Sequence, residues 1–91
     1  MLDRKAKYII WDNGLNECVM IFSNHIMHAN VALALNITPI SAGFVEFTSN
    51  GDMINVIVSG DSVSLRCKSR PEDANIIANE LKLSFGRANP L

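Results

Sequence analysis

Two histidines and one glutamate are the residues best suited to acid–base or metal chemistry in this chain. His25 and His28 lie three positions apart, so a helix would place both imidazoles on one face. Glu46 stands alone as an acid within an otherwise apolar segment, and buried carboxylates are groups that catalytic sites use. If the three converge on a cavity, they predict a small ligand-binding or enzymatic site. The alternative is a pair of half-exposed helix-start histidines and a glutamate at a solvated strand position.

Metal and thiol chemistry have little support in the spacing. Two histidines alone do not make a metal site, and neither Cys18 nor Cys67 belongs to a Cys-x-x-Cys pair. Cys18 lies within an apolar segment, which disfavours the thiolate that a nucleophile needs. We therefore expect two unpaired core thiols, no metal ion and no cofactor.

Three cations could form a binding surface for an anion. Arg66, Lys68 and Arg70 alternate along the chain, so a strand would present all three on one face. This pattern suits an anionic ligand or an oligonucleotide, and it also suits an exposed edge strand whose charges prevent unwanted strand pairing. Acidic residues follow directly, at positions 72 and 73, and the net charge is −1. Both observations favour the edge-strand interpretation and make nucleic acid an improbable partner.

Recognised catalytic motifs are missing from the sequence. It contains no glycine-rich phosphate loop, no nucleophile elbow and no His-Glu-x-x-His run. This favours a non-enzymatic protein without catalytic residues. Tyr8 and Trp11 are then the natural anchors for a protein partner, unless both are core residues.

The first half of the chain predicts a hairpin followed by a helix. β-branched and aromatic residues at 7–11 and 17–22 indicate two strands, joined by a loop that contains Asn13-Gly14. Ser23-Asn24 can cap a helix over 25–36, which must end before Pro39. The apolar residues of this helix surround its axis, so we expect it to be buried on more than one side.

The second half predicts three strands and a second helix. Segments 40–48 and 53–58 flank an Asn50-Gly51 turn, and Gly43 marks a bulge or a close approach. Alternation over 63–68 predicts a fifth strand. Ser69 and Glu72 have capping-box spacing for a helix that ends near Leu83 or Ser84.

These elements predict one α+β domain over residues 1–91, with flexible ends at 1–6 and 86–91. The order β-β-α-β-β-β-α gives an antiparallel sheet of about five strands with two helices. Several strands are apolar on both faces, as Ile9 and Trp11 oppose Tyr8 and Ile10. Two short helices would cover one face, so we expect a homodimer to cover the other; a strongly curled sheet is the alternative.

Three segments are similar to small uncharacterised proteins that bacteriophages and prophages encode. They are Ile40-Ser41-Ala42-Gly43-Phe44-Val45, Gly60-Asp61-Ser62-Val63-Ser64-Leu65 and Ser69-Arg70-Pro71-Glu72-Asp73-Ala74. Together they cover about a third of the chain, and they carry turn and cap chemistry. The resemblance implies a phage origin and no particular activity, substrate or cofactor.

Localisation follows from hydropathy. The longest nearly uninterrupted apolar run, 26–35, is about half of what a membrane span needs, and the run behind the charged start is too short for a signal peptide. We therefore expect a small cytoplasmic accessory protein that self-associates and binds another protein.

Overall fold

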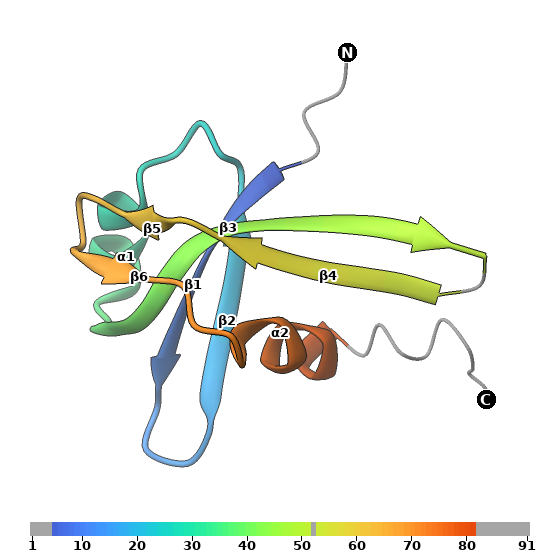
Figure 1. The fold of residues 1–91 in the computed structure, drawn as a ribbon. Coiled ribbons are helices and arrows are strands. Elements are labelled where there is room, and N and C mark those ends of the chain that lie inside the picture. Colours follow the sequence, from blue (N-terminus) through green and yellow to red (C-terminus); the bar gives the residue numbers. More distant parts are fainter. Residues whose placement is uncertain (1–4, 52, 82–91) are drawn as a thin grey trace.

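The structure is a computed structural model that describes residues 5–51 and 53–81 of the chain. The elements follow one another as β1 (Lys5–Asp12), β2 (Glu17–Phe22), α1 (His28–Leu35), β3 (Pro39–Asn50), β4 (Met53–Ser59), β5 (Asp61–Ser62), β6 (Cys67–Lys68) and α2 (Asp73–Leu81) (Figure 1). Within the described residues, the two helices and the antiparallel strands confirm the predicted α+β class.

The main sheet has four strands in the order β2-β1-β3-β4. All its pairs are antiparallel, and β1 and β3 form its centre, while β2 and β4 form its edges. A register shift lies between Ile10 and Trp11 where β1 pairs with β3. The β3–β4 hairpin extends away from β1 and β2 (Figure 1), so the sheet is curled rather than flat.

The predicted fifth strand over 63–68 is wrong in its bounds. The chain instead forms two short strands, β5 and β6, which pair with each other as a separate sheet. Between them, Arg66 has a left-handed φ of 56°, and its N–H donates to the Val63 carbonyl. This turn breaks the alternation, because a residue in that conformation cannot continue a strand.

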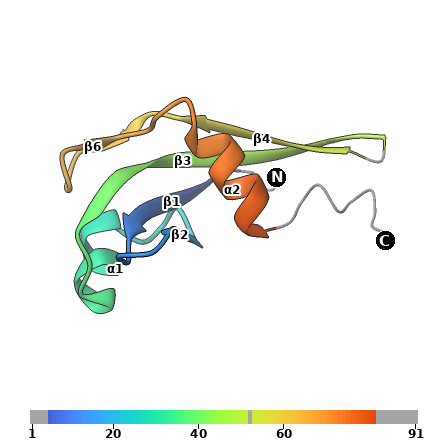
Figure 2. The ribbon, with the colours of Figure 1, turned by 90° about the horizontal axis from the view of Figure 1, so that it is seen from below.

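Each face of the sheet is covered by a helix of the same chain. On one face, Ile77 of α2 packs with Tyr8, Ile10 and Val45. On the other, Ala32 of α1 packs with Ile9 and Ala42. Figure 2 shows α2 and α1 at different levels of the curled sheet. Alternate side chains of β1 therefore point into two different cores. The prediction that both helices cover a single face of the sheet is wrong.

Helix α1 begins three residues later than predicted. The Ser23 hydroxyl accepts the N–H of His25, and the Ser23 carbonyl accepts the N–H of Ile26, so this segment forms a turn. Met27, with extended φ and ψ of −73° and 139°, precedes the first helical residue. The predicted end is confirmed, because Asn36 adopts the left-handed conformation with φ of 56° and closes the helix.

Helix α2 is capped by different residues from those predicted. The Ser69 hydroxyl donates to the Gly60 carbonyl at 2.8 Å instead of capping the helix. The Asp73 carboxylate accepts the N–H of Arg70 at 2.9 Å, as the acidic residue of a capping box does. The capping pair therefore lies one residue later in the chain. The predicted helix end near Leu83 or Ser84 lies outside the described residues.

Gly43 is a point of close approach, as predicted. A Cβ atom there would lie 2.7 Å from the Ser59 carbonyl oxygen and 3.1 Å from the Ser69 Cβ. Any larger residue would push β3 away from the end of β4 and from Ser69.

The predicted flexible ends overlap the described residues at Lys5 and Ala6. Both belong to β1, where they pair with Glu46 and Val45. The rest of the predicted ends lies outside the described residues. Of the helices in residues 5–51 and 53–81, none has the length and apolarity to cross a membrane.

Candidate functional site

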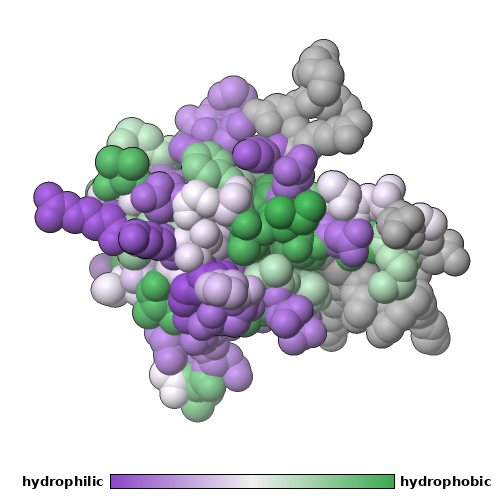
Figure 3. Space-filling model, viewed as in Figure 1, coloured by the Kyte–Doolittle hydropathy of each residue, from purple (hydrophilic) through white to green (hydrophobic). Residues whose placement is uncertain are grey.

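The outer edge of β4 is the most exposed apolar element of the sheet. Met53, Ile54 and Ile57 have exposed fractions of 54%, 38% and 48%. Val56 and Val58 are half-buried and pack against the core beneath α2. In Figure 3 a patch of hydrophobic surface lies over this strand. An edge strand whose side chains remain in solvent leaves its backbone available to a further strand.

The sequence of β4 lacks the features that usually protect an edge. Met53–Ser59 contains no charged residue and no proline, and among the described residues its ladder to β3 has no bulge. The opposite edge, β2, is half-buried along its whole length and begins with Glu17. Of the two edges, β4 is therefore the one suited to strand addition. The Asn50-Gly51 turn predicted this strand, but nothing local in the sequence indicates an edge position.

The three residues of the predicted pocket do not form one site. His28 is buried, with an exposed fraction of 4%, whereas His25 is exposed in the turn before α1. Glu46 lies in β3 opposite Lys5 and Ile57. Over the described part of the chain, no group of three His, Cys, Asp or Glu side chains could hold a metal ion.

The His28 ring is held by the fold. Its Nε2 atom lies 2.9 Å from the Gly43 carbonyl oxygen, which can only accept, so this nitrogen carries the proton. The rings of Phe22 and Phe44 approach it edge-on at 5.5 and 5.9 Å. Burial lowers the pKa of His28 below its usual 6.5, and the nearby Lys7 acts in the same direction. His28 is therefore neutral at pH 7, with one nitrogen already occupied.

A small cleft of about 320 Å³ opens beside this ring. Its walls come from β1, the start of α1, β3 and the β5 segment, and they are formed by Lys7, Met27, His28, Phe44, Asp61, Ser62, Val63 and Ser64. The Lys7 ammonium donates to the Ile26 carbonyl at 2.9 Å. Neither His25 nor Glu46 lines the cleft, so the predicted acid–base set is not assembled there.

The three cations of the predicted anion-binding surface do not lie on one face of a strand, because the chain turns between β5 and β6. Arg66 lies in the turn and Lys68 in β6, both exposed, and Arg70 lies beyond the strand. Arg70 is engaged by carboxylates: its Nη2 lies 2.9 Å from Glu17 Oε1, and its Nε lies 2.8 Å from Asp73 Oδ1. These contacts raise the pKa of Arg70. Its charge is therefore neutralised within the protein.

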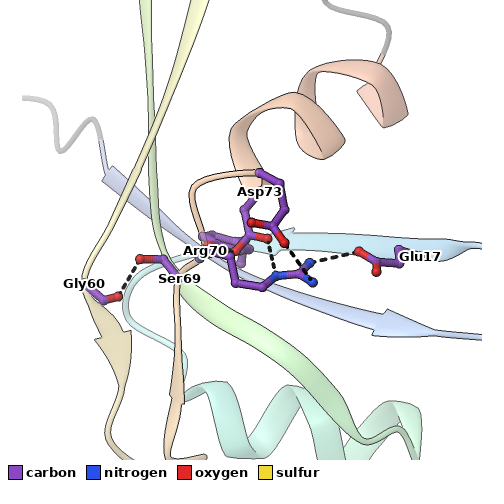
Figure 4. A network of polar contacts seen from close by, with 7 residues as sticks. Glu17, Gly60, Ser69, Arg70 and Asp73 are labelled. Atoms are coloured by element: carbon purple, nitrogen blue, oxygen red, sulfur yellow. Dashed lines mark hydrogen bonds and ion pairs between the residues drawn. The ribbon is translucent and has the colours of Figure 1, made fainter.

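A polar network connects α2 to the sheet (Figure 4). The Tyr8 hydroxyl donates to Asp73 Oδ2 at 2.5 Å, and both side chains are fully buried. Burial and this carboxylate raise the pKa of Tyr8 far above its usual value of 10. Arg70 then extends the network to Glu17 on β2. This network could not be predicted from the sequence, because Tyr8 and Asp73 lie 65 positions apart and no local pattern links them.

A second, larger cleft of about 570 Å³ lies at the outer end of this network. It separates the β1–β2 loop from α2, and its walls are formed by Asn13, Asn16, Glu17, Cys18, Glu72, Ile76, Asn79 and Glu80. The carboxylates and carboxamides can accept hydrogen bonds. Arg70 already engages Glu17, and it lies 3.7 Å from Glu72.

The two aromatic anchor candidates both contribute to the interior. Tyr8 is fully buried in the core beneath α2, and Trp11 is half-buried and packs against the core beneath α1. This is the core role that the sequence left open for them. Both cysteines are free and half-buried, and Cys67 Sγ lies 3.7 Å from the Pro39 carbonyl oxygen.

Comparison of the chain with protein-family models, with curated proteins and with solved structures found no match. The phage origin that the sequence resemblance implies therefore stays a prediction.

Proposed function

We propose that this chain is a small cytoplasmic interaction protein that binds an extended segment of a polypeptide along the outer edge of β4. The observation that carries the proposal is the uncharged, exposed edge strand Met53–Ser59. Strand addition uses main-chain hydrogen bonds for affinity and alternate side chains for specificity. Ile54 and Val56 on one side and Ile57 on the other provide those side-chain contacts.

The two other candidate functions have less support. A ligand pocket at His25, His28 and Glu46 has less support because, of the three, only His28 lines the cleft. Anion binding through Arg66, Lys68 and Arg70 would need the Arg70 guanidinium, which pairs with Glu17 and Asp73. Strand addition at β4 requires no change in the contacts that hold His28 or Arg70.

A synthetic peptide tests the proposal directly. The probe carries the sequence of residues 53–59 between added lysines, and it is titrated into isotope-labelled protein while backbone amide shifts are followed by NMR. We expect saturable shifts concentrated on β4. The matched control peptide is N-methylated at the positions of Val56 and Ile57, which removes one hydrogen-bond donor from each of its edges. We expect it not to bind.

Two results would contradict the proposal. One is the absence of shifts along β4, at peptide concentrations well above that of the protein and at a protein concentration where the chain is monomeric. The other is equal binding of the N-methylated peptide, because main-chain pairing would then play no part.

A further inference from the structure

We infer that the segment added to β4 is the β4 strand of a second copy of this chain, paired antiparallel about a two-fold axis at Val56. The inference rests on the proposed function and names its partner. It joins two four-stranded sheets into one continuous sheet across the axis.

Alternate residues of β4 direct their backbone N–H and C=O groups away from β3, toward the outer edge of the sheet. Asn50 and Met53 form the last pair of the β3–β4 ladder before the turn. In a two-residue hairpin this closing pair shares hydrogen bonds, and the pattern alternates along an antiparallel ladder. The N–H and C=O groups of Ile54, Val56 and Val58 therefore point away from β3. An antiparallel partner centred on Val56 meets all three.

The side chains of β4 are self-complementary in this register. Val56 faces its own equivalent, and Ile54 faces Val58 of the partner subunit, on the side of the sheet that α2 covers. On the opposite side, Asn55 faces Ile57 of the partner subunit. Apolar side chains thus meet apolar ones on the α2 side, and pairs of this kind stabilise a sheet.

Charge also favours a second copy. Self-pairing normally places like charges near one another, but Met53–Ser59 carries none, so no repulsion opposes it. Ile57, with an exposed fraction of 48%, loses solvent contact in the pair. The absence of charge therefore removes the usual obstacle to pairing two copies of the same strand.

Two double variants test the register. Asn55→Lys/Ile57→Lys places lysines opposite lysines across the axis, whereas Asn55→Glu/Ile57→Lys places glutamate opposite lysine. Both variants put the same lysine beside Glu46 on β3, and both alter only exposed positions. We expect the unmodified chain to be dimeric in sedimentation equilibrium. The lysine–lysine variant should dissociate roughly tenfold more readily, and the glutamate–lysine variant should remain dimeric. Circular dichroism confirms that each variant folds.

Other outcomes overturn the inference. Equal dimerisation of both variants would mean that a different surface forms the dimer, and monomers in both would mean that the register is wrong. If the unmodified chain is monomeric at every concentration but binds the peptide, self-pairing fails while the proposed function stands. If the peptide also fails to bind, both fail.

Discussion

His28 is a residue type that can act in acid–base or metal chemistry, but in this fold its ring has a structural role. Its ring lies between Phe22 and Phe44, and its protonated Nε2 donates to the Gly43 carbonyl. Gly43 has no room for a side chain, because an added Cβ would lie 2.7 Å from the Ser59 carbonyl oxygen. The ring therefore ties α1 to the tightest point of β3, and protonation of its second nitrogen would place a charge in an apolar site.

The lowered pKa of His28 predicts a loss of stability in mild acid. Below its usual pKa of 6.5, the unfolded chain gains a proton that the folded chain resists. The free energy of unfolding should be at its plateau above pH 6.5 and decline as the pH falls toward 5. Urea unfolding across this range measures the decline.

Matched histidine variants isolate the cause. His28→Gln should remove most of the slope between pH 6.5 and 5, although it lowers the plateau, because the titrating group is gone. His25→Gln changes an exposed side chain and should leave the slope as it is. A slope that survives in His28→Gln would assign the acid sensitivity to another group.

At the scale of elements, α2 is attached to the sheet by both packing and charge. Ile77 enters the core, and Asp73 reaches the Tyr8 hydroxyl within it. Arg70 links this buried carboxylate to Glu17 on the edge strand β2. Removing the cation would leave the Asp73 charge with fewer partners in a site that solvent does not reach.

Arg70→Met should weaken the attachment of α2. We expect a loss on the order of 2–3 kcal/mol, less than for a fully buried pair because the Arg70 side chain keeps 26% of its surface exposed. Amide hydrogen exchange over α2 should accelerate more than exchange in β1 and β3.

Glu72→Gln is the control for this effect. Its contact with Arg70 is 3.7 Å and its side chain is 57% exposed, so the change should cost less than about 0.5 kcal/mol. Equal losses in both variants would show that the buried part of the network contributes little.

At the scale of the whole molecule, one sheet serves two cores. Tyr8 and Ile10 face α2, while Ile9 between them faces α1. The two cores share the backbone of β1 and β3, so neither can open without affecting the other. The exposed β4 edge is the part of this sheet that neither helix covers completely.

This arrangement predicts a single cooperative unfolding transition. Ile9→Val and Ile10→Val each remove one methylene group from a different core, and each should lower the free energy of unfolding by about 0.5–1.5 kcal/mol. Urea unfolding should remain one transition with an unchanged slope in both variants. Two separate transitions in either variant would mean that the cores unfold independently.

The sequence by itself determined the fold class, the first four strands and the turns that join them in pairs. β-branched and aromatic residues predicted β1 and β2, alternation predicted most of β3, and the Asn50-Gly51 turn predicted β4. The predicted end of α1 before Pro39 is also where the structure ends it. These features depend on neighbours a few positions apart. The start of α1 and the cap of α2 were misplaced because several Ser, Asn and acidic side chains compete for the same local hydrogen bonds.

Only the tertiary structure decided which side chains meet and which strand lies at the edge. The sequence could not show whether His28 and Glu46 lie together, and in the structure Glu46 does not line the cleft beside His28. The packing of α2 on the sheet brings Asp73 to Tyr8 and Arg70 to Glu17. Strand order and twist depend on contacts between distant parts of the chain, and periodicity along one segment carries no information about them.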